Sequence, residues 1–280
     1  MNDLTICTVI TFFYNEKFFK YLENTIKNLN KLNFNLSIHV LTNTCDKSEQ
    51  KKLTKLCRMI RGDIEIHIPY LLGHPMLLPY SNYSLMKNLY NEKKYSHFLY
   101  IEDDITLTNK NIDYWLSNMK ILDGTSFYPS FIRVEKNIEN KFVYADIKKR
   151  MYIKKLPSIK VNNNLYVNLK YPYQGMYLYD RHQLNEMLQS DSINPNFSKD
   201  EIIEKGNLGL TYSNVPDGFI SRNLVKIINN NPDPGSIIIH ARSRSINGLI
   251  KNNIFGRKRF YRNDGFNTTL GTIYKDEIFL

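Results

Sequence analysis

The sequence has few cysteines and no long apolar run. The only cysteines in its 280 residues are Cys7, Cys45 and Cys57, which are widely spaced and form no CxxC pair. An odd number at this spacing argues against a disulfide scaffold or a zinc–thiolate site and favours buried thiols in a reducing compartment. No apolar stretch approaches the roughly 20 residues of a transmembrane helix, and the N-terminus lacks the regions of a signal peptide. We therefore expect a cytoplasmic protein whose contact with any membrane is peripheral.

Composition indicates a folded chain with a surplus of basic residues. Hydrophobic residues make up 42% of the chain and aromatic residues 13%, which is enough for a sizeable core. The formal net charge of +11 favours a polyanionic partner such as nucleotide phosphates, nucleic acid or an anionic membrane surface. No internal repeat or linker-like stretch divides the sequence, so we expect one domain over residues 1–280.

Apolar and amphipathic segments alternate over the first hundred residues. Apolar runs predict strands over residues 4–13, 37–41, 64–68 and 98–101. Helical spacing predicts helices over residues 14–29, 46–60 and 80–90. Asp46 and Ser81 are candidate helix caps, and the strand histidines His39 and His67 are expected to face solvent or a core partner. This order is typical of βαβ units, so the predicted fold class is α/β, with a mainly parallel, Rossmann-like sheet flanked by helices.

The second half of the sequence is less regular. It predicts helices over residues 109–122, 181–188, 199–205 and 219–228. It predicts strands over residues 127–135, 171–179 and 237–240. The charged, Asn-rich stretch 136–170 is either a hairpin insertion or a mobile loop, and the pattern leaves both open.

Three consecutive acids, Glu102, Asp103 and Asp104, end the buried run 98–101. Their carboxylates repel one another unless a cation neutralises them, and Mg²⁺ and Mn²⁺ prefer oxygen ligands. Along a strand Glu102 and Asp104 point to one side, so these two acids can share an ion. Ligands of open α/β sheets also bind just past the carboxyl ends of the strands. The alternative is a solvated acidic turn, but the buried run before the acids favours a metal site.

Gly175, Asp217 and His240 follow the acids in that order. Together with the opening segment LTICTVITFFYNE, this arrangement resembles the GT-A fold glycosyltransferases, which use nucleotide sugars. That class carries an acidic DxD motif at a strand end, a glycine-containing loop, a later carboxylate at a helix N-terminus and a C-terminal metal-binding histidine. Glu102 replaces the usual first Asp of the motif, which preserves the carboxylate chemistry. The resemblance extends over most of the chain as a set of short motifs.

The resemblance implies a division of the chain and a set of metal ligands. Residues 1–108 would be the nucleotide-binding half, 109–240 the acceptor-side half and 241–280 a basic C-terminal tail. Asp104 would be the most direct ligand of Mn²⁺ or Mg²⁺, with Glu102 on the ion or the ribose and Asp103 assisting. His240 would add a neutral imidazole ligand. The alternative for His240 is a hydrogen-bonded structural residue, as a lone histidine at a strand end often is.

Donor and acceptor binding would fall to residues near the ends of other strands. The residues expected at the base and ribose are Thr11, Phe12, Tyr14, Asn15, Thr42 and Asn43. Gln174 and Gly175 would contact a sugar, because glycine lets the backbone approach a ligand closely. The alternative for this segment is the interior of a strand among core tyrosines. Arg242 would contact the diphosphate, although a solvated basic face is the commoner setting for such a residue.

Asp217 is the candidate general base, which takes the proton from the acceptor hydroxyl in an inverting transfer. An Asp before a helix is equally well explained as an ordinary N-cap, and Asp200 and Glu201 are alternative bases. The sequence thus predicts a metal-dependent glycosyltransferase that moves a sugar from a nucleotide-sugar donor to a carbohydrate or glycolipid acceptor. Surface polysaccharide or lipopolysaccharide synthesis is the expected setting, and inversion is slightly preferred because a base candidate exists.

Two other classes remain as alternatives. A nucleotidyltransferase usually holds its triphosphate with a glycine-rich basic loop after the first strand, and residues 12–16 contain no glycine. A nucleic-acid-binding protein or metal-dependent nuclease would explain the charge, but only residues 257–262 mix basic and aromatic side chains densely. Nucleic acid is therefore not the expected partner. The basic tail instead suits peripheral contact with an anionic membrane, at its inner face, where a lipid-linked acceptor resides.

Overall fold

The central layer of the molecule is a five-stranded sheet. The computed structural model describes residues 4–59, 63–71, 75–137, 139–145, 156–169, 172–173, 175–194, 197 and 205–242. The strands of the central sheet are β1 (Thr5–Phe12), β2 (Asn35–Thr42), β3 (Asp63–His67), β4 (His97–Glu102) and β11 (Met176–Asp180). Their order is β11-β4-β1-β2-β3, and every pair in it is parallel except β11 with β4. The predicted α/β fold with a mainly parallel sheet is confirmed.

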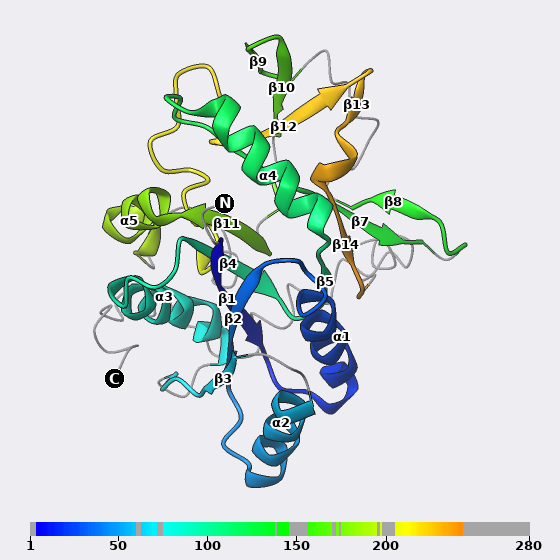
Figure 1. Cartoon of the computed structure of the whole chain (residues 1–280), viewed down its shortest axis with the longest axis vertical. Helices are drawn as coiled ribbons and strands as arrows, with labels where there is room; N and C mark the ends of the chain where they lie inside the picture. Colours follow the sequence, from blue (N-terminus) through cyan, green and yellow to red (C-terminus); the bar gives the residue numbers. More distant parts are fainter. Residues whose placement is uncertain are drawn as a thin grey trace.

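Helices cover both faces of this sheet. They are α1 (Phe19–Leu29), α2 (Lys47–Met59), α3 (Ser81–Asn91), α4 (Asn109–Leu122) and α5 (Arg181–Gln189). On one face α1, α2 and α4 share a core cluster with Ile10 and Val40 of the sheet. On the other face α3 and α5 pack against Val9 and Phe98, and Figure 1 shows α1 and α3 on opposite sides of the strands. Burial on both faces explains why β1 shows no polar alternation.

Local sequence signals place the starts of two helices. Asp46 caps α2 as predicted, since its Oδ1 accepts hydrogen bonds from the backbone N–H of Ser48 at 2.8 Å and of Glu49 at 3.1 Å. Thr108 and Asn111 form a capping box at the start of α4, whose bounds coincide with the predicted helix 109–122. Capping supplies partners for backbone N–H groups that have none inside the helix.

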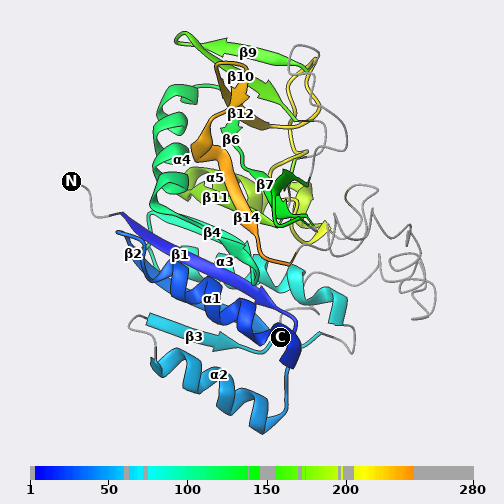
Figure 2. The same cartoon turned by 90° about the vertical axis from the view of Figure 1, so that its right-hand side faces the viewer.

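A second sheet lies at the opposite end of the molecule from α2 (Figures 1 and 2). Its strands are β6 (Tyr128–Pro129), β9 (Ser158–Val161), β10 (Asn164–Asn168), β12 (Asn223–Ile228) and β13 (Asn231–Pro232). The order is β13-β12-β10-β9, with β6 beside β12. Asn162 and Asn163 have φ values of 46° and 63° and form the tight turn between β9 and β10. This part of the stretch 136–170 is therefore a hairpin.

Two predictions in the second half were wrong. The helix expected over 219–228 is replaced by β12, because Leu224 to Ile227 pair antiparallel with β10 and bury apolar side chains there. The single strand expected over 127–135 is two strands, β6 and β7 (Ile132–Lys136), which belong to different sheets.

A third, smaller sheet connects the two ends of the described chain. Its strands are β5 (Ile105–Thr106), β7, β8 (Phe142–Tyr144) and β14 (Ile237–His240). The order is β5-β14-β7-β8, and His240 of β14 lies opposite Ile105 of β5. This pairing brings the last described strand beside the turn that carries the three acids.

The part of the chain that the structure describes also contains the short 3-10 helices η1 (Glu16–Phe18), η2 (Pro75–Tyr80), η4 (Asp191–Ile193) and η5 (Pro234–Ser236). No helix in the described ranges combines the length and apolar character needed to cross a bilayer. The predicted basic tail from residue 243 onward and the predicted helix 199–205, apart from residue 205, lie outside the described residues.

Candidate functional site

The three acids lie at the carboxyl end of β4. Glu102 is the last residue of β4 and pairs with Thr11 on the neighbouring β1. Asp103 and Asp104 occupy the turn before β5, and both are almost fully buried, with 5% and 3% of their surface exposed. From α1, the Thr25 hydroxyl donates hydrogen bonds to the carbonyl oxygens of Asp103 at 2.8 Å and Ile105 at 3.2 Å. The helix thereby fixes the backbone of the acidic turn.

His240 joins these acids from the end of β14. Its Nε2 lies 3.1 Å from Asp104 Oδ2, and its Nδ1 lies 3.0 Å from Oε1 of Glu135 on β7. The backbone N–H of Ala241 donates to the carbonyl of Asp104 at 2.8 Å, which holds the two segments in register. Ligand atoms of Glu102, Asp104 and His240 all lie within 4.8 Å of one another. The structure thus brings together the three residues predicted as metal ligands.

Burial and mutual contacts change the acidity of these groups. Burial and the neighbouring Asp104 raise the pKa of Glu102, and burial raises the pKa of Asp103 to about 7. Burial also acts to raise the pKa of Asp104, but its contacts with His240 and Arg242 outweigh this and lower it. Burial acts to lower the pKa of His240, yet hydrogen bonds to Asp104 and Glu135 raise it to about 9. Without a metal ion, His240 is therefore charged at neutral pH.

Gly175 and Tyr173 position Glu102. The backbone N–H of Glu102 donates to the Gly175 carbonyl at 2.9 Å, and the Tyr173 hydroxyl donates to Glu102 Oε2 at 2.9 Å. A Cβ on Gly175 would collide with the Tyr173 hydroxyl and lie 2.5 Å from Glu102 Oε2. Glycine is needed here because two side chains of the site approach the backbone closely, and contact of Gly175 with a sugar stays a prediction. Gln174, predicted to contact a sugar, lies outside the described residues.

Arg242 lies against the acids. Its Nη2 pairs with Asp103 Oδ1 and its Nε with Asp104 Oδ2. The guanidinium also lies over the ring of Phe18, 4.7 Å from the centroid. The expected contact of Arg242 with a diphosphate stays a prediction, and its observed role is to neutralise two carboxylates.

The side chains around the three acids are suited to binding a divalent cation. Within the described part of the chain, the buried oxygens Asp103 Oδ2 and Asp104 Oδ1 have no hydrogen-bond partner, an arrangement that is costly for a carboxylate without a cation. The site collects four carboxylates, counting Glu135, and two guanidiniums. When all four carboxylates are ionised and His240 is neutral, two negative charges remain in excess of Arg133 and Arg242, and one divalent ion balances them. Two carboxylates and an imidazole are ligands that Mn²⁺ accepts.

The predicted nucleotide-contacting residues lie where β1 and β2 end, next to Glu102 in the sheet. Tyr14 and Asn43 connect the two loops, because the Tyr14 N–H donates to Asn43 Oδ1 at 2.7 Å. The Thr11 hydroxyl is 2.7 Å from the Tyr100 hydroxyl, and Asn15 caps η1 by accepting from the Lys17 N–H at 3.0 Å.

Phe12 and Thr42 are directed into the protein. Both are fully buried and pair with each other across β1 and β2, and the Phe12 ring packs against the Tyr14 ring at 5.6 Å. Their side chains therefore support the loops, and contact of these six residues with a nucleotide stays a prediction.

Asp217 lies in an exposed turn, Pro216 to Phe219, that leads into the second sheet. Gly218 in this turn has φ of 80°, and no helix follows, so Asp217 is not an N-cap. Within the described residues, no hydrogen bond or ion pair joins it to the carboxylate cluster. Its role as a base stays a prediction.

The sequence analysis missed three residues of the site, namely Glu135, Tyr173 and Arg133. Glu135 has none of its surface exposed and is the second partner of His240. Tyr173 holds Glu102 and is itself covered by Arg133, whose guanidinium carbon lies 4.6 Å from the ring centroid. The signal for Tyr173 was its place two residues before Gly175, whereas Glu135 resembles any solvent-facing residue of an amphipathic strand.

Comparison with known proteins identifies the fold. A scan against protein-family models finds no match, and no curated protein matches the sequence. Among solved structures, GalNAc-T7 with UDP, GalNAc and Mn²⁺ matches with a TM-score of 0.52 and 11% identity, covering 86% of this chain and 44% of that chain. S. aureus TarS 1–349 matches with a TM-score of 0.45 and 10% identity, covering 89% of this chain and 64% of that chain. The chain spans about half the length of such structures, and it has the GT-A glycosyltransferase fold that its motifs predicted.

Proposed function

We propose that this protein is a metal-dependent glycosyltransferase that moves a sugar from a nucleotide-sugar donor to a carbohydrate or glycolipid acceptor. The observation that carries the proposal is the convergence of Glu102, Asp104 and His240 within 4.8 Å at the carboxyl end of β4. This is the edge at which open α/β sheets bind their ligands. Mn²⁺ or Mg²⁺ is the expected cation, and the GalNAc-T7 structure with the same fold contains Mn²⁺ and UDP.

The residues of the chain have distinct tasks in this proposal. Glu102, Asp104 and His240 hold the cation, which when bound neutralises charge on the departing diphosphate. Tyr173 orients Glu102 through a hydrogen bond, and Glu135 orients His240 through an ion pair.

Binding of the base and ribose is assigned to the loops after β1 and β2. Tyr14 and Asn43 tie these loops together, so a nucleoside bound there would rest on a fixed backbone. Asp217 is the proposed base that takes the proton of the acceptor hydroxyl, and its exposed turn leaves the carboxylate open to an incoming sugar. The inverting course rests on this assignment, and a surface-glycan acceptor is a separate part of the proposal.

A thermal-shift panel tests the donor site. UDP, GDP, CMP and their sugar conjugates are each added with Mn²⁺ or with EDTA. A ligand at a hundred times its Kd stabilises the native state by about 2.7 kcal/mol. We expect one nucleotide to raise Tm only with metal, in the wild-type protein and in Asp113→Asn, which alters an exposed acid of α4. Asp104→Asn should abolish the shift.

Two outcomes would contradict the proposal. One is no shift with any nucleotide in either condition. The other is salt-sensitive binding to random duplex DNA with metal-dependent cleavage, which would establish the nuclease alternative.

A further inference from the structure

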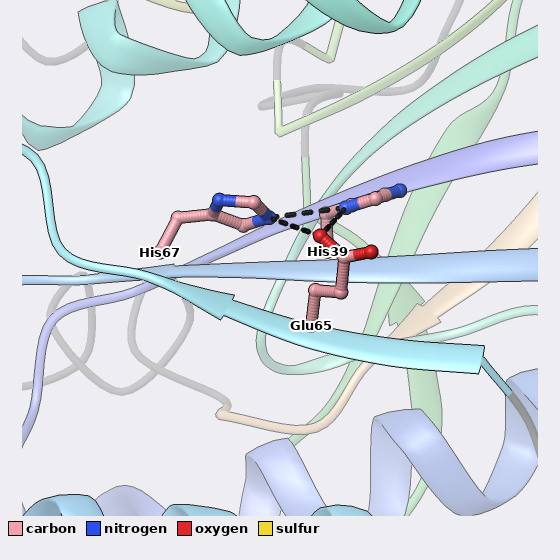
Figure 3. Close-up of side chains that lie close together, drawn as sticks. All are labelled: His39, Glu65 and His67. Atoms are coloured by element: carbon pink, nitrogen blue, oxygen red, sulfur yellow. Dashed lines mark hydrogen bonds and ion pairs between the residues drawn. The ribbon is translucent and has the colours of Figure 1, made fainter.

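A second cluster of metal-ligating side chains lies on the central sheet, apart from the acids. His39 of β2 and Glu65 of β3 are directly opposite each other in the parallel pair, and His67 is two residues beyond Glu65. Because side chains alternate along a strand, Glu65 and His67 project from the same face. Figure 3 shows Nδ1 of His39 facing His67 and Glu65, with its other ring nitrogen pointing away.

The three donor atoms have the spacing of zinc ligands. His39 Nδ1 is 3.0 Å from His67 Nε2, and Glu65 Oε2 is 3.7 Å from the first and 3.6 Å from the second. Zinc bonds of about 2.1 Å at tetrahedral angles place neighbouring ligand atoms about 3.4 Å apart. One of the three observed distances is shorter than this value and two are longer.

Glu65 distinguishes a metal site from a plain hydrogen-bonded pair. Two neutral imidazoles could share one hydrogen bond without any metal, which would explain the His39–His67 distance. That explanation leaves Glu65 without a reason for its position, because its carboxylate oxygen is too far from both rings for a hydrogen bond. A cation between the three atoms accounts for all three distances.

The far side of the His39 ring is held as in metal sites. Ser37 donates its hydroxyl proton to Asp63 Oδ2 at 2.9 Å, so its oxygen is left to accept from His39 Nε2 at 3.2 Å. The Tyr95 hydroxyl lies 3.5 Å from the same nitrogen. A proton on Nε2 leaves the Nδ1 lone pair free to bind a cation, and such a partner on the outer nitrogen is usual for metal-bound histidines.

Exposure leaves a route for the ion and room for a fourth ligand. The side chain of His39 is 1% exposed, that of His67 29% and that of Glu65 54%. The cluster is therefore anchored in the core at one corner and open to water at the other two. Three protein ligands with one open position are typical of zinc bound by histidine and carboxylate.

We propose that His39, Glu65 and His67 bind a Zn²⁺ ion that joins the edge strand β3 to β2, with water as the fourth ligand. Imidazole-rich ligands favour zinc over Mg²⁺, in contrast to the carboxylate-rich site at Asp104. The strand β3 has no fully buried residue and pairs only with β2 in the described chain. A metal crosslink would thus hold an edge that packing secures weakly. This site is independent of the proposed glycosyl transfer.

Zinc retention measured in the full chain tests the proposal. All variants are made in an Asp104→Asn background, called the parent, so that the acidic site does not contribute to the zinc that is measured. After Zn²⁺ loading and gel filtration, we expect a single ion per chain by elemental analysis, and an intense visible spectrum when Co²⁺ replaces Zn²⁺. Both signals should be lost on adding His67→Ala and kept on adding His182→Ala, which changes an exposed histidine of α5.

Two further variants guard against misfolding. Glu65→Gln changes an exposed side chain and should weaken Zn²⁺ affinity with no change in circular dichroism. Ser37→Ala removes the nearer of the two partners of His39 Nε2 and should weaken Zn²⁺ affinity by about 10–100-fold. Equal zinc content and equal Co²⁺ spectra in the parent, His67→Ala and Glu65→Gln would overturn the proposal, as would a parent that retains no zinc.

Discussion

A divalent metal ion and a proton compete for His240 in the acidic site. Although burial acts to lower its pKa, the hydrogen bonds to Asp104 and Glu135 raise the pKa of His240 to about 9. A metal ligand must present an unprotonated nitrogen, so the ring has to lose a proton before it binds Mn²⁺. At pH 7 about one ring in a hundred is neutral in the metal-free protein. The apparent affinity for Mn²⁺ should therefore rise about tenfold per pH unit below pH 9.

The assay is a Mn²⁺ titration followed by the electron paramagnetic resonance of the free ion at pH 6, 7 and 8. From pH 6 to pH 8 we expect about a 100-fold gain in affinity for the wild-type protein. Asp103, whose pKa burial raises to about 7, also titrates in this range. The His240→Gln variant measures that residual dependence, and it should bind more weakly with a much shallower slope. A Mn²⁺ affinity that is constant across this pH range in the wild type, or an equal slope in both proteins, would show that protons do not compete with the ion for His240.

Three further predictions concern the same site. Tyr173→Phe removes the hydroxyl that donates to Glu102. It should lower the free energy of unfolding in urea by about 1–3 kcal/mol and weaken Mn²⁺ binding. Unchanged values would mean that Glu102 needs no such donor. Gly175→Ala places a Cβ 2.5 Å from Glu102 Oε2. It should lower the free energy of unfolding in urea by about 1–3 kcal/mol and abolish Mn²⁺ binding. A variant that binds Mn²⁺ as well as the wild type would show that the backbone around Gly175 can shift at little cost. The folded pKa of His240, about 9, exceeds its ordinary value, so in EDTA its contribution to stability is complete below pH 6.5 and is lost as pH rises through 9. That loss should be on the order of 3 kcal/mol in urea unfolding at pH 6.5 and 9.5, and a flat profile would contradict the pairing with Asp104.

Local patterns could predict the strands and helices of the first half of the chain and the first helix of the second half. The apolar run 98–101 lies within β4, and Glu102 is that strand's last residue. The amphipathic spacing over 109–122 coincides with α4. In both cases the deciding forces are burial of a contiguous face and backbone capping, which neighbouring residues in the sequence determine.

The second half depended on pairings that no local pattern contains. The segment 219–228 has apolar residues at spacings compatible with a helix, yet Val225 lies opposite Val167 of β10. Its β-branched residues suit a strand, but only the presence of β10 decides between the two. Likewise, β6 and β7 are two strands because each pairs with a different sheet, which the local sequence does not reveal.

The proposed metal ligands of the acidic site could be predicted from the sequence, but the residues that contact and orient them could not. Glu102, Asp104 and His240 were found from the buried strands that precede them. Glu135 is buried because β14 lies beside β7, a contact between segments about a hundred residues apart in sequence. Arg242 was expected on a phosphate, and its position on Asp103 and Asp104 follows from the pairing of β14 with β5.

The pairing of β5 with β14 also bears on how the protein is made. Asp104 and Arg242 are 138 residues apart in sequence, so a ribosome delivers the acidic turn long before the strand that neutralises it. Chains fold from the N-terminus during synthesis, and the acids of a nascent chain remain without their histidine and arginine until β14 emerges. Metal loading at this site therefore waits until β14 has been synthesised, and a bound ion would distinguish a chain that contains β14 from one interrupted before it.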